Sequence, residues 1–166
     1  MEKFQIAHLD LKPENLVLDK NNKIRIIDLG SAREFSYSGP FITTADYCPP
    51  DWKTSDYDRS KHDVFSSGEI IYSMFSKNKH GKKQKTGSST TRFANRHTVQ
   101  QMDKDAIPHN PKLRELLQKL LDPNPKNRCT AREAVEMIKS AGANWNKRSS
   151  KTILASEVTI NTRVGA

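Results

Sequence analysis

The sequence predicts an α+β fold that is mainly helical and contains one short β-hairpin. Residues 16–18 and 24–27 are short apolar runs typical of strands, and the polar residues between them are typical of a turn. Farther along, residues 57–76 and 110–140 carry apolar side chains at helical spacing. The length of 166 residues allows one domain.

Polar side chains flank the two outer ends of this hairpin. His8, Asp10, Lys12 and Asn15 precede the first strand, and Asp28 follows the second. Because a hairpin brings its outer ends together, we expect folding to gather these groups in one place. A small set of oxygen ligands of this kind suits Mg²⁺, which shares its coordination shell with phosphate and water.

The motif HLDLKPEN, at residues 8–15, and the later DLG resemble the catalytic and metal-binding loops of eukaryotic protein kinases, with LKPEN typical of Ser/Thr kinases. The resemblance implies that Asp10 accepts or orients the proton of the substrate hydroxyl. It implies that Lys12 lies near the phosphate transferred from ATP and that Asn15 and Asp28 hold Mg²⁺. His8 is expected to support the loop. The alternative is that these side chains are structural hydrogen-bonding groups in a relative that does not catalyse.

Leu9 stands where the family has an arginine that can pair with a phosphate on the activation loop. Leucine cannot form such a charge-assisted hydrogen bond. We therefore do not expect control of this chain by that route.

Residues 31–51 resemble the family's activation segment, and TTADYCPPD is similar to the pattern GTxxYxAPE. The resemblance implies that Thr44 bridges the catalytic aspartate and lysine. It also predicts a structural ion pair between Asp51 and Arg128. The stretch KHDVFSSG resembles the central helix of the larger kinase lobe, so Asp63 is expected to hold the backbone of the catalytic loop.

The resemblance covers only the larger, C-terminal lobe of a kinase. Residues 1–141 are expected to form this truncated domain, with the smaller N-terminal lobe absent, and residues 142–166 a polar tail. Only seven residues precede the motif, which is too few for the Gly-rich loop and the lysine that anchor ATP, and no GxGxxG occurs elsewhere. Two further helices are expected, one capped by Asn110 and one opened by a Thr130–Glu133 capping box.

A basic stretch interrupts the resemblance, and residues 77–92 are expected to form a loop. The formal net charge is +9, and no acidic residue lies between Glu69 and Asp103. The basic side chains in that interval are Lys77, Lys79, Lys82, Lys83, Lys85, Arg92 and Arg96. No aromatic residue interleaves residues 77–92, so a solvated loop is favoured over a nucleic-acid or anionic-lipid site. A basic loop that recruits an acidic substrate or partner ranks between these two interpretations.

The two cysteines show no metal or redox spacing, and no apolar run is long enough to span a membrane. We therefore expect reduced thiols and a cytoplasmic or nuclear location.

Three functions remain open from the sequence. One is a Ser/Thr protein kinase that uses ATP and Mg²⁺ to phosphorylate a protein substrate. Another is a non-catalytic half-kinase, or pseudokinase, that binds a partner kinase or its substrate. A third is a truncated product of a longer gene. The absent first helix predicts an uncovered apolar face on the central helix, and hence self-association or a partner there.

Overall fold

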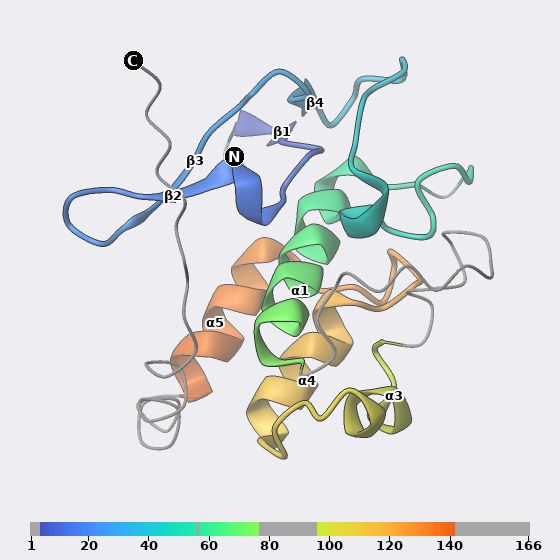
Figure 1. The fold of residues 1–166 in the computed structure, drawn as a ribbon. Coiled ribbons are helices and arrows are strands. Elements are labelled where there is room, and N and C mark those ends of the chain that lie inside the picture. The colour runs from blue at the N-terminus through green and yellow to red at the C-terminus, as the bar shows by residue number, and fades with distance from the viewer. Residues whose placement is uncertain (1–3, 56, 77–95, 142–166) are drawn as a thin grey trace.

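The computed structural model describes residues 4–55, 57–76 and 96–141, and it is mainly helical with two small sheets (Figure 1). Its strands are β1 (Ile6–Ala7), β2 (Leu16–Leu18), β3 (Ile24–Ile26) and β4 (Arg33–Glu34). Its α-helices are α1 (His62–Phe75), α3 (Val99–Lys104), α4 (Pro111–Leu120) and α5 (Ala131–Ala141). Short 3₁₀ turns cover Pro13–Asn15, Ala45–Tyr47 and Arg59–Lys61.

The predicted hairpin is confirmed. Strands β2 and β3 pair antiparallel, with Leu16 opposite Ile26. The turn is closed by the side chain of Asp19, whose Oδ1 accepts the backbone N–H groups of Asn21 at 2.8 Å and Lys23 at 3.0 Å. Such side-chain acceptors make Asp a favoured turn residue.

A second antiparallel pair joins β1 to β4, with Ile6 opposite Glu34 and Ala7 opposite Arg33. The sequence did not predict it, because strands of two residues are too short to show an alternating pattern. This pair anchors the start of the loop at residues 8–15 to the segment that follows the hairpin.

Helix α1 is the centre of the helical layer; α4 packs against α1, and α5 packs against α4 (Figure 1). The helix begins later than the sequence suggested, because Asp58 caps the preceding 3₁₀ turn by accepting the N–H of Ser60. Gly68 allows α1 and α4 to approach closely. A Cβ at that position would lie 2.8 Å from Leu120 Cβ and from Leu121 Cδ2.

Both predicted helix caps are present. Asn110 Oδ1 accepts the N–H groups of Lys112 and Leu113 at the start of α4. At the start of α5, Glu133 N–H donates to Thr130 Oγ1 at 3.1 Å and Thr130 N–H donates to Glu133 Oε2 at 2.7 Å. This reciprocal pair is a capping box. The leucines of α4 form the core with α1 as expected: Leu113, Leu116, Leu117 and Leu120.

The expected uncovered apolar face of the central helix is largely covered. Val64 and Phe65 are buried, and Ile71 and Phe75 pack against the core that α1 shares with α3 and α4. Helix α3 had no predicted counterpart. Among the exposed large apolar side chains of the described residues, only Met74 comes from α1. The hairpin and the two apolar positions just after it contribute more: Val17, Leu18, Ile24, Ile26, Ile27 and Leu29.

No helix in the described part of the chain is long and apolar enough to cross a membrane. The predicted basic loop at 77–92 and the predicted tail at 142–166 lie outside the described residues.

Candidate active site

A carboxylate of α1 accepts hydrogen bonds from the backbone of the loop at residues 8–15. Asp63 Oδ2 accepts the backbone N–H of His8 at 2.6 Å, and Oδ1 accepts that of Leu9 at 2.9 Å. Leu9 is fully buried and has a φ of 66°, a left-handed conformation that a leucine rarely adopts. The two bonds to Asp63 hold this strained turn in place, as the resemblance predicted.

His8 connects the loop to the end of the hairpin. Its Nδ1 lies 3.3 Å from the Asp10 nitrogen and its Nε2 lies 3.0 Å from the Ile27 oxygen. The tautomer that carries hydrogen on Nε2 satisfies both contacts. The Ile27 backbone N–H also donates to the backbone oxygen of Asn15 at 3.0 Å. These bonds fix the hairpin end immediately before Asp28, so the loop and Asp28 are brought together as predicted.

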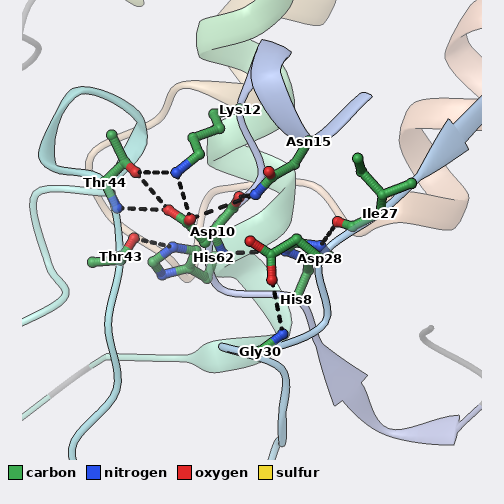
Figure 2. Close-up of polar contacts among 10 residues, drawn as sticks. All are labelled: His8, Asp10, Lys12, Asn15, Ile27, Asp28, Gly30, Thr43, Thr44 and His62. Carbon is green, nitrogen blue, oxygen red and sulfur yellow. Dashed lines mark hydrogen bonds and ion pairs between the residues drawn. The ribbon is translucent and has the colours of Figure 1, made fainter. Parts of the chain in front are cut away.

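Asp10 is the hub of a polar cluster with Lys12 and Thr44 (Figure 2). Its Oδ1 accepts the Thr44 N–H at 2.8 Å and the Thr44 hydroxyl at 2.6 Å. Its Oδ2 accepts from Lys12 Nζ at 2.8 Å, and Lys12 Nζ also donates to Thr44 Oγ1 at 3.1 Å. The predicted bridging position of Thr44 is therefore present in the structure.

Charge and hydrogen bonds keep Asp10 ionised. Partial burial alone would raise its pKa, but hydrogen bonds from Lys12 and Thr44 and the Lys12 charge outweigh burial and place the pKa below its usual value. The hydrogen bond to Asp10 raises the pKa of Lys12 despite some desolvation, and the charges of Glu14 and Asp28 add to the rise. Both groups are therefore charged near neutral pH, and Asp28 lies within electrostatic reach of Lys12.

Asn15 and Asp28 present oxygens beside this cluster. The Asn15 side-chain nitrogen donates to the Asp10 backbone oxygen at 2.9 Å, which fixes the orientation of the amide. Asp28 is exposed, with a φ of 61°, and its Oδ1 accepts the Gly30 N–H at 3.2 Å. Figure 2 shows Asn15 on the opposite side of Asp10 from Thr44.

The predicted ion pair between Asp51 and Arg128 is confirmed. Arg128 donates from Nη2 to Asp51 Oδ1 at 2.7 Å, and both side chains are buried. The same guanidinium donates to the backbone oxygens of Lys61 at 3.2 Å and Asp122 at 3.0 Å. Arg128 thus connects the end of the activation segment, the start of α1 and the turn before α5.

One supporting residue, His62, escaped the sequence analysis. It is fully buried, with Nδ1 2.8 Å from the Tyr57 hydroxyl and Nε2 3.3 Å from Thr43 Oγ1. Burial first, and then the charge of Arg128, lower the pKa of His62 to about 3. Thr43 occupies a glycine position of the family pattern. Its hydroxyl contacts His62, and a glycine at this position could not make that contact. Only the position of His62 next to Asp63 hinted at this role.

A buried acid, Glu69, was also missed. It pairs with Arg96, and the guanidinium of Arg96 lies 5.2 Å from the centre of the Tyr72 ring. In the sequence, Arg96 is one of the basic residues before Asp103, beyond the expected loop at 77–92, and no role is predicted for it; in the structure its guanidinium pairs with this carboxylate of α1. Burial raises the pKa of Glu69 to about 7, although Arg96 lowers it.

We expect Arg96→Gln to destabilise the protein by about 3 kcal/mol at about pH 8, and by less at about pH 5.5. The folded-state pKa of Glu69 lies above its unfolded value, so stability is lost as the pH rises through about 7. Without Arg96 the carboxylate must be buried unpaired or take up a proton.

Urea unfolding at the two pH values measures the difference, with Arg132→Gln at an exposed position as the control. An equal loss of stability at both pH values would contradict this account of Glu69.

The comparisons with known proteins agree with this geometry. Residues 1–138 match the family model described as protein kinase domain. The chain belongs to the protein kinase domain family. The family as a whole transfers phosphate to proteins and generally uses ATP and Mg²⁺.

Three relatives are Ser/Thr kinases. The chain is 41% identical over 75 residues to serine/threonine-protein kinase chk1 of Schizosaccharomyces pombe. This alignment covers 42% of the chain and 15% of that protein. It is 29% identical over 146 residues to serine/threonine-protein kinase PKH1 of Saccharomyces cerevisiae, an alignment that covers 77% of the chain and 18% of that protein. It is 29% identical over 137 residues to serine/threonine-protein kinase PknB of Mycolicibacterium smegmatis, an alignment that covers 74% of the chain and 21% of that protein. The matched part is thus about a fifth or less of each relative.

The kinase-family residues present here fit a magnesium ion. Within the described residues, no group of three or more His, Cys, Asp or Glu side chains could hold a metal by itself. Mg²⁺ does not need such a group, because it retains waters and binds substrate phosphates. Asp28 is exposed and ionisable, and the Asn15 amide is oriented by its nitrogen. The donor chemistry therefore suits an ion shared with a phosphate ligand.

Proposed function

We propose that this chain carries the half of a Ser/Thr protein kinase site that orients the hydroxyl and holds magnesium. The observation that carries the proposal is the contact of Asp10 with both Thr44 and Lys12. A carboxylate that accepts from three donor groups of two residues, and is kept ionised, can orient an incoming hydroxyl with little reorganisation.

In this proposal, the substrate Ser or Thr hydroxyl donates its proton to Asp10 while its oxygen bonds to the γ-phosphorus of ATP. The bond from that phosphorus to the bridging oxygen breaks, and ADP leaves. Lys12 balances charge on the transferred phosphoryl group. Asn15 and Asp28 would hold Mg²⁺, which would neutralise charge on the phosphates.

The direct test is transfer of radiolabelled γ-phosphate from ATP to a mixture of Ser/Thr peptides. We expect Asp10→Asn to lower the rate by about 100-fold, because it removes the proton acceptor. Glu136→Gln is the control, since Glu136 is exposed and lies on α5 away from the site. Transfer that survives Asp10→Asn would refute the assigned role.

A second candidate function, a non-catalytic binding module, is favoured by the exposed apolar side chains of the hairpin. Leu18 and Ile24 are opposite one another across the two strands and are 67% and 65% exposed. Contiguous apolar surface of this kind marks an interface. A folded wild-type chain without phosphotransfer would favour this function.

Sedimentation velocity tests the binding-module candidate. Self-association that is lost in the Leu18→Ser/Ile24→Ser variant would support it, and a wild-type monomer that also binds no kinase would oppose it.

A further inference from the structure

A pocket of about 300 Å³ lies outside the cluster around Asp10, between the activation segment and the approach to α1. Its lining residues are Ser38, Gly39, Pro40, Phe41, Trp52, Tyr57 and Arg59. The volume is at the lower end of the range for small-molecule sites. Most of the lining is aromatic or otherwise apolar, and Arg59 is its cation.

The guanidinium of Arg59 is packed among aromatic rings. Its central carbon lies 5.3 Å from the ring centre of Tyr57, 5.5 Å from that of Phe41 and 5.7 Å from that of Tyr37. Such contacts hold the cation in place through its attraction to the ring faces. They do not use its N–H donors, which lie in the plane of the group.

Among the described residues, one acceptor is recorded for these donors. Nη2 donates to the Gly39 oxygen at 3.4 Å, which is longer than usual for this type of bond. The buried Nε of Arg59 has no hydrogen-bond partner, and Arg59 forms no ion pair with a carboxylate of the described residues. The adjacent Asp58 is committed to the N–H and hydroxyl of Ser60. Within the part of the chain that the structure describes, the positive charge of Arg59 in this pocket therefore has no carboxylate partner.

A second cation is close to the same wall. Lys53 Nζ lies 4.5 Å from the centre of the Trp52 ring, and Lys53 is exposed. Ser38 adds a hydroxyl to the lining. Two cations and a hydroxyl complement a doubly charged phosphoryl group, which carries a charge of about −1.5 to −2 near neutral pH. The rings of Phe41, Trp52 and Tyr57 complement a flat apolar group beside it.

We propose that this pocket binds a phosphate monoester of a flat apolar group, with Arg59 contacting the phosphoryl oxygens. The planar guanidinium matches a phosphoryl group through paired N–H donors, and its stacking fixes the orientation in advance. The group can belong to a small aryl phosphate or to a phosphotyrosine side chain of a peptide. Neither source involves the cluster at Asp10, so the proposal stands apart from phosphotransfer.

Trp52 provides the readout. The chain has two tryptophans, so a Trp145→Phe background leaves Trp52 as the only one. In this background, we expect phenyl phosphate to change Trp52 fluorescence in a saturable manner. Phenol and inorganic phosphate should each bind about tenfold more weakly, because each lacks one of the two complementary parts.

Variants at residue 59 test the arginine itself. Arg59→Gln should weaken phenyl phosphate binding by about tenfold or more, and Arg132→Gln, at an exposed position on α5, should leave it unchanged. Arg59→Lys keeps the charge but loses the planar donors, so it should also bind more weakly. Thermal unfolding of each variant establishes that the fold is retained. If Arg59→Gln does not fold, the binding measurement on Arg59→Lys tests the role of the arginine.

The sources are separated by comparing phenyl phosphate with a phosphotyrosine peptide. Tighter binding of the peptide assigns the site to a peptide partner, and equal binding assigns it to a small ester. The proposal is overturned if the wild-type chain shows no saturable change, if phenol binds as tightly as phenyl phosphate, or if the Arg59 variants bind like the wild type.

Discussion

Arg128→Met is expected to destabilise the protein by about 3 to 5 kcal/mol, the largest effect of any single change considered for this fold. The substitution leaves the Asp51 carboxylate buried without its cation. It also removes the donors to the backbone oxygens of Lys61 and Asp122. Urea unfolding followed by circular dichroism measures the loss.

The double variant Asp51→Leu/Arg128→Met distinguishes a buried charge from lost packing. We expect it to recover part of the stability, because removal of both charges avoids the penalty for an unpaired carboxylate. Arg132→Gln, at an exposed position, should change the free energy of unfolding by less than about 0.5 kcal/mol. A near-neutral Arg128→Met would mean that the pair contributes little to the fold.

Asp63→Asn is expected to cost about 3 kcal/mol, because it weakens two hydrogen bonds to a charged acceptor. One oxygen of the side chain is replaced by an NH₂ group that faces a backbone N–H of His8 or Leu9. The strained φ of Leu9 is then no longer held, and we expect the loop at residues 8–15 to relax.

Two measurements separate this local effect from a general loss of stability. Urea unfolding gives the total cost, and amide hydrogen exchange at His8 and Leu9 should be faster by about tenfold or more than in the wild type. Ser73→Ala, which removes a single hydroxyl bond to Ile70 O on the same helix, is the control. Unchanged exchange at both amides in Asp63→Asn would contradict the holding role.

Local chemistry accounts for much of what the sequence predicted. The hairpin follows from two β-favouring runs around an Asp-led turn, and the caps of α4 and α5 follow from Asn110 and the Thr130–Glu133 pair. The Asp51–Arg128 pair lies 77 positions apart in sequence. Only the family resemblance predicted it, because no local pattern connects such distant residues.

The missed features depend on tertiary packing. His62 and Glu69 look like ordinary polar positions on a helix, and their burial depends on segments far along the chain. The expectation of an uncovered α1 face rested on the resemblance, in which another helix of the family covers that face. It did not anticipate that half of the exposed large apolar side chains of the described residues would instead belong to the hairpin and the residues that follow it. Short pairings such as β1 with β4 leave no periodic signal.

The central claim is that Asp10, Lys12, Asn15 and Asp28 form a half-site that engages magnesium and a nucleotide phosphate. Calorimetric titration of the purified chain with ATP, with and without Mg²⁺, tests it most directly. The account predicts binding that requires Mg²⁺, is lost in Asp28→Ala and persists in Glu136→Gln. Binding that is unaffected by Asp28→Ala, or absent in the folded wild-type chain, would contradict it.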